Sequence, residues 1–141
     1  MTMLPSIHDH CLIEYRVHLP DRQVTLITLP EEGRFRSGID PVVTVFEGLE
    51  GHHFERVSSG VIFLDISDIP LSEFLRDHQA ELAEGHRLVG APGWWPGSVS
   101  AAEAYLKSRG AHSFEINSSY GFSGWVLAAS VRQARLGGTS V

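Results

Sequence analysis

The chain has 141 residues, of which 43% are hydrophobic and 20% charged, and its net charge is −6. These values are typical of one soluble globular domain with its own core, and no apolar stretch is long enough to cross a bilayer. An acidic balance argues against nonspecific nucleic-acid binding, which needs a basic surface. It is compatible with a basic protein partner.

Cys11 is the single cysteine, so no internal disulfide can form. The first five residues lack the basic and then apolar pattern of a secretory signal. Both observations favour a cytoplasmic protein. His10 precedes Cys11, but neighbours on a strand point to opposite sides, so this histidine is poorly placed to activate the thiol. We expect Cys11 to be a buried packing residue.

The first half of the chain is dominated by strand patterns. Four strands are predicted, at residues 11–18, 23–29, 42–47 and 61–66. The first two alternate between apolar and polar side chains and form a hairpin around a turn at Pro20 and Asp21. Gly48 to Gly51 indicate a turn after the third strand, and the fourth strand is apolar enough to be covered on both faces.

The spacing of apolar residues then changes to three and four, which is the period of an α-helix. The apolar stripe of this first helix consists of Leu71, Phe74, Leu75, His78 and Leu82. Asp68 or Ser72 is expected to cap its start, and Gly85 to end it.

A second helix is predicted after the loop 86–97. Ser98 or Ser100 can cap it, and Ser100 has the spacing of a capping box with Glu103. Gly110 is placed just past its end.

Residues 113–117 and 124–131 predict two closing strands, so the element order is ββββααββ. The expected fold is therefore α+β, with a mainly antiparallel sheet and two helices packed on one face. We expect a single domain at 1–131 and a flexible tail at 132–141.

Four acidic residues lie within one narrow arc of the first predicted helix: Glu73, Asp77, Glu81 and Glu84. We call this set the acidic ridge. Like charges four residues apart repel each other, so the arrangement opposes helix formation slightly. The ridge is either a solvated helix face or a binding surface for a basic partner.

Trp94 and Trp95 stand in the loop 86–97, which is rich in glycine and proline. Exposed apolar patches are rare on monomers, so at least one of these side chains is expected to pack back onto the domain. The other interpretation is contact with a partner, because tryptophan is favoured at interface hot spots.

Eight histidines are present, and His8, His10, His52 and His53 could supply imidazole ligands to a metal. None of the established zinc-binding spacings occurs, and exposed histidines in loops and at strand ends explain the same pattern. We therefore expect no cofactor.

Three segments resemble a group of small bacterial proteins: VTVFEGLEGHHFE, GVIFLDISDIPLSEFL and AYLKSRGAHSFEINSSYGFSGWVLAAS. The resemblance covers residues 10–131. That group is similar in size and build to the immunity proteins of bacterial toxin systems. The resemblance implies a cytosolic, acidic domain that blocks a cognate toxin by binding it, and it implies no catalytic residues.

Two functional hypotheses follow. The first is a non-catalytic protein-binding domain, such as an immunity-like inhibitor, that contacts a basic partner through the acidic ridge and the tryptophan loop. The alternative is a small enzyme or a metal- or ligand-binding protein that uses the four histidines with Asp65 or Asp68. Self-association into a homo-oligomer is left open.

Overall fold

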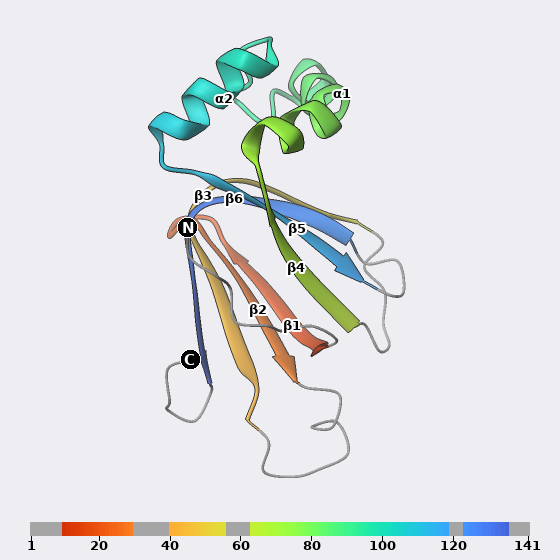
Figure 1. Ribbon diagram of the computed structural model, residues 1–141, viewed down its shortest axis with the longest axis vertical. Helices are drawn as coiled ribbons and strands as arrows, with labels where there is room; N and C mark the ends of the chain where they lie inside the picture. The colour runs from red at the N-terminus through yellow and green to blue at the C-terminus, as the bar shows by residue number, and fades with distance from the viewer. Residues whose placement is uncertain (1–9, 30–39, 56–62, 119–122, 136–141) are drawn as a thin grey trace.

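The computed structural model describes residues 10–29, 40–55, 63–118 and 123–135. The elements in these ranges are β1 His10–His18, β2 Gln23–Leu29, β3 Val42–Glu55, β4 Phe63–Ile69, α1 Leu71–Val89, α2 Val99–Ser108, β5 His112–Ser118 and β6 Ser123–Arg135. All strand pairs are antiparallel, and the strands form a closed barrel in the order β1-β2-β3-β6-β5-β4. The two helices lie side by side at the top of Figure 1. The α+β class with an antiparallel sheet is confirmed, whereas closure of the barrel was not predicted.

Strand β6 divides its side chains between two cores because successive residues of a strand point to opposite faces. Val126 and Ala128 point into the barrel, and Trp125 and Leu127 point outward to the helices. The barrel core also contains Val24, Leu26, Phe46, Leu49, Phe114 and Ile116. The core between barrel and helices also contains Phe74, Leu75, Leu82, Trp95, Ala102, Leu106 and Ala111. The helix layer therefore packs against the outer side of the barrel wall.

The third strand is longer than predicted, because the predicted turn at Gly48 to Gly51 is part of β3. The pairing of β3 with β6 shifts its register between Leu49 and Gly51, which is a bulge that leaves Glu50 as the extra residue. Gly48 has a φ of 69°, and a Cβ there would lie 2.7 Å from the Cβ of Ala129. Glycine at this position therefore bends a continuous strand instead of ending it.

The predicted ends of the first helix are both wrong. Asp68 belongs to β4, and Ser72 lies inside α1, which starts after Pro70 without a side-chain cap. Gly85 also lies inside α1, and Gly90 follows the last turn with a φ of 71°. A Cβ at Gly85 would lie 2.7 Å from the carbonyl oxygen of Ala91, so this glycine allows the loop to approach the helix closely.

The predicted start of the second helix is resolved in favour of Ser98, whose Oγ accepts a hydrogen bond from the amide of Ala101. The alternative cap, Ser100, is a helical residue of α2. Gly110 directly follows the C-cap, as predicted, and has a φ of 70°.

The closing strand is also longer than predicted. Residues 132–135, assigned above to a flexible tail, belong to β6 and pair with β3. The register of this pairing places Arg132 opposite Val45 and Arg135 opposite Val42. Residues 136–141 lie outside the described ranges.

Glu50, the extra residue of the β3 bulge, joins the barrel to the helix layer. Its side chain is 7% exposed and pairs with Arg22 of the first hairpin turn and, over 3.0 Å, with Arg109 at the end of α2. Its backbone carbonyl accepts a hydrogen bond of 2.8 Å from Trp94 Nε1. In the described parts of the chain, no helix combines the length and the apolar composition needed to cross a membrane.

Candidate functional site

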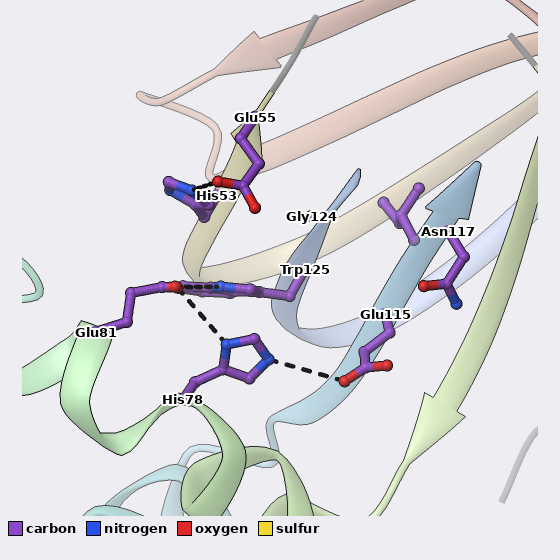
Figure 2. Close-up of a pocket in the computed structure, with 9 residues that line it drawn as sticks. His53, Glu55, His78, Glu81, Glu115, Asn117, Gly124 and Trp125 are labelled. Atoms are coloured by element: carbon purple, nitrogen blue, oxygen red, sulfur yellow. Dashed lines mark hydrogen bonds and ion pairs between the residues drawn. The ribbon is translucent and has the colours of Figure 1, made fainter. Parts of the chain in front are cut away.

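A pocket of about 200 Å³ opens between α1 and the outer face of the barrel wall (Figure 2). Its lining comes from α1 and from strands β3, β5 and β6, and consists of His53, Glu55, His78, Glu81, Glu115, Ile116, Asn117, Gly124 and Trp125. Pockets for drug-sized ligands hold about 300–1,000 Å³. This pocket is therefore sized for a small group, such as the end of one side chain.

The strand register brings the pocket residues of the barrel together. His53 of β3 is opposite Trp125 of β6, and Trp125 is opposite Glu115 of β5. Because cross-strand neighbours share a face, these three side chains form a row on the outside of the barrel. The rings of His53 and Trp125 stack with their centroids 6.1 Å apart.

His78 on α1 lies over this row and between two carboxylates. Its Nδ1 is 3.6 Å from Glu81 Oε1, and its Nε2 is 3.7 Å from Glu115 Oε1. Figure 2 shows the imidazole between these two side chains. The ring also contacts Phe74 one turn earlier, with centroids 4.5 Å apart. This aromatic contact explains why a histidine can occupy the apolar stripe of the helix.

Trp125 of β6 orients the carboxylate of Glu81 on α1. Its Nε1 donates a hydrogen bond of 3.0 Å to Glu81 Oε1, and the side chain is 6% exposed. Glu55 lies at the opposite side of the pocket, 3.5 Å from His53 Nε2. Glutamates from α1, β3 and β5 thus line the same pocket.

The charge of the pocket is negative. Glu55, Glu81 and Glu115 are among its lining residues, and none of these residues is an arginine or a lysine. The only positive charge that the lining can supply is on the two histidines when they are protonated. The arrangement is therefore suited to attract a cation.

The four residues of the acidic ridge differ in their contacts. Glu81 turns into the pocket, whereas Glu84 is bound by Arg87, whose Nε lies 3.1 Å from Glu84 Oε2. The hydrogen bond from Arg87 lowers the pKa of Glu84. Glu73 and Asp77 are exposed on α1. One member of the ridge thus contributes to the pocket, and two add negative charge on the same helix.

The tryptophan loop packs back onto the protein. Trp95 is 8% exposed and belongs to the core below the helices. Trp94 is half-buried and stacks on Tyr105 of α2, with centroids 5.9 Å apart. Both side chains therefore stabilise the helix layer, and neither is part of the pocket.

The four histidines considered for a metal site are not brought together. His8 lies outside the described ranges, and His10 at the start of β1 contacts Thr28 over 3.1 Å. His52 and His53 are neighbours on β3, but the His52 ring packs against Phe54 and the His53 ring against Trp125. Burial lowers the pKa of His10 and of His52, and the charge of His53 lowers that of His52 further.

Carboxylates and thiols do not complete a metal site either. Within the described residues, no group of three or more histidine, cysteine, aspartate or glutamate side chains is placed to hold a metal ion. Asp65 and Asp68 lie on β4 and are not among the pocket residues. Cys11 is buried, as expected.

Sequence patterns did not identify three central pocket residues: His78, Glu115 and Trp125. His78 was counted as part of an apolar stripe, although a titratable residue in such a stripe can indicate a polar site beneath the helix. Glu115 and Trp125 were visible only as residues of closing strands, because their pairing depends on the register of β5 with β6.

Comparison of the chain with protein-family models, curated proteins and solved structures finds no match.

Proposed function

We propose that this protein is a non-catalytic binding domain that holds a positively charged side chain of a protein partner in the pocket between α1 and the barrel wall. The observation that supports it is the convergence of Glu55, Glu81 and Glu115 on a pocket with no arginine or lysine in its lining. A cation entering this volume would be attracted by carboxylates from three separate elements.

The partner is expected to present a basic surface. Asp77 and Glu73 lie exposed about one and about two helical turns before Glu81, so the negative field extends from the pocket along α1. Complementary charge mainly increases the rate of association and the specificity for one partner. An immunity-like role is the narrower form of this proposal, and it requires that the partner lose its activity when bound.

The test uses a penta-arginine peptide as the cationic probe, titrated by calorimetry at low ionic strength. The double variant Glu55→Gln/Glu115→Gln removes two pocket charges. The control Glu84→Gln/Glu103→Gln makes the same change in net charge at two glutamates paired with Arg87 and Lys107 outside the pocket.

Each partly exposed charge contributes up to about 1 kcal/mol, or about fivefold in Kd, so the pocket variant should bind more than about twofold and up to about 25-fold more weakly. The control should change the affinity by less than about twofold. An equal loss in both double variants would show that the peptide responds to net charge and not to the pocket. The same pair of variants then tests any protein that copurifies from the host.

A further inference from the structure

His78 is the one pocket residue whose two ring nitrogens face carboxylates on different elements. Nδ1 faces Glu81 on α1 at 3.6 Å, and Nε2 faces Glu115 on β5 at 3.7 Å. A neutral imidazole has one N–H, whereas the protonated ring donates from both nitrogens and carries a full positive charge. Protonation therefore places a cation between two of the three pocket carboxylates.

The other charged groups that line the pocket belong to β3. These are Glu55 and His53, whose Nε2 lies 3.5 Å from the carboxylate of Glu55. Asn117 and Trp125 do not titrate in the range of histidine. A proton on His78 thus changes the charge available to an entering cation at Glu81 and Glu115, and a proton on His53 acts mainly at Glu55.

We propose that the proton on His78 and the positively charged group of the partner compete for the carboxylates of the pocket, so that binding is pH-dependent. This inference rests on the proposed function. With His78 neutral, the carboxylates attract the guest. With His78 protonated, one charge is compensated and the guest is repelled by the imidazolium.

The direction of the effect follows from linkage. If binding displaces the proton, the affinity is highest where His78 is neutral, and it falls as the pH drops through the titration of this ring. Full competition at one site weakens binding by up to about tenfold per pH unit. A partner held where the ring is neutral would therefore be released on acidification.

The experiment measures penta-arginine binding by calorimetry at about pH 7.5 and pH 5.5, at constant ionic strength. Repeating the titration in two buffers with different ionisation enthalpies gives the number of protons released on binding. The wild-type protein should bind more weakly at the lower pH, by up to about tenfold per pH unit, and should release protons on binding between these two pH values. His78→Gln should bind at pH 7.5 and lose most of this pH dependence, whereas the control His18→Gln, at an exposed histidine outside the pocket, should keep it.

A second measurement avoids substitution. In the wild-type protein, saturating peptide should move the NMR titration midpoint of the His78 ring to lower pH. An unchanged midpoint, or the same pH profile in wild type and His78→Gln, would overturn the competition. The two proposals fail separately: a flat pH profile with a weakened Glu55→Gln/Glu115→Gln variant rejects only the competition, and unchanged binding in that variant rejects the pocket itself.

Discussion

Trp125 Nε1 on β6 donates a hydrogen bond of 3.0 Å to Oε1 of Glu81 on α1. The same indole ring packs edge-on against Phe74, with ring centroids 5.2 Å apart, in the core between the helices and the barrel. One side chain therefore serves both the packing of α1 and the orientation of a pocket carboxylate. Stability and the geometry of the site are coupled at this residue.

Trp125→Phe should lower the free energy of unfolding by about 1–2 kcal/mol, because a hydrogen bond to a charged acceptor is lost and a smaller ring remains. A double-mutant cycle with Glu81→Ala isolates the pair. Its coupling energy should be about 1 kcal/mol in urea denaturation. Additive effects of the two substitutions would show that the hydrogen bond does not contribute to stability.

Glu50→Gln should lower the free energy of unfolding by about 2 kcal/mol. Loss of one partner of a buried ion pair costs about 3–5 kcal/mol, and this figure is reduced because Arg22 and Arg109 are about half exposed. Glu47→Gln is the matched control on the same strand, because Glu47 is 36% exposed in its pair with Arg132. A similar loss in the two variants would refute the role of Glu50 in joining barrel and helices.

Ser98→Ala should destabilise the protein by about 1 kcal/mol through loss of the helix cap. Ser100→Ala, at an exposed helical position, should change stability by less than about 0.5 kcal/mol. Chemical denaturation of both variants distinguishes the two caps that the sequence allowed. The reverse ranking would place the start of α2 two residues later.

The sequence predicted the fold class because local signals agree in each element. Alternation in residues 11–18 and 23–29 indicated the hairpin, and the spacing of apolar residues indicated α1. Closure of the barrel could not be predicted, since it depends on His10 and Cys11 of β1 pairing with Leu64 and Phe63 of β4. No local pattern specifies a pairing between strands so far apart in the chain.

Glycines produced the main errors in the element boundaries. Gly48 and Gly85 were interpreted as ends of elements, but each lies within one. In both cases the absent side chain accommodates a neighbour, the Cβ of Ala129 and the carbonyl oxygen of Ala91. Composition alone cannot distinguish a glycine that ends an element from one that permits a close approach.

The candidate site was predicted only in part. Glu81 was identified on the acidic ridge, as part of a surface for a basic partner, and His53 was identified in the histidine set, as a metal ligand. Their meeting at one pocket depends on the packing of α1 over the row formed by His53, Trp125 and Glu115. That tertiary contact has no signature in the spacing of the sequence.

Acidification should reduce stability through His10 and His52, whose pKa values burial lowers from 6.5 in the folded protein. As the pH falls below 6.5, the unfolded chain takes up protons first, so stability is lost until the pH passes the folded pKa values. Urea denaturation at pH 7.5 and 5.5 should show this loss. His52→Gln should make it smaller, and the exposed His18→Gln should leave it unchanged.

Peptide binding by the two charge-matched double variants tests the central claim most directly. Penta-arginine should bind Glu55→Gln/Glu115→Gln more than about twofold and up to about 25-fold more weakly than wild type, and Glu84→Gln/Glu103→Gln within about twofold of it. This result would assign cation binding to the pocket between α1 and the barrel. Equal affinities of the two variants would contradict that assignment.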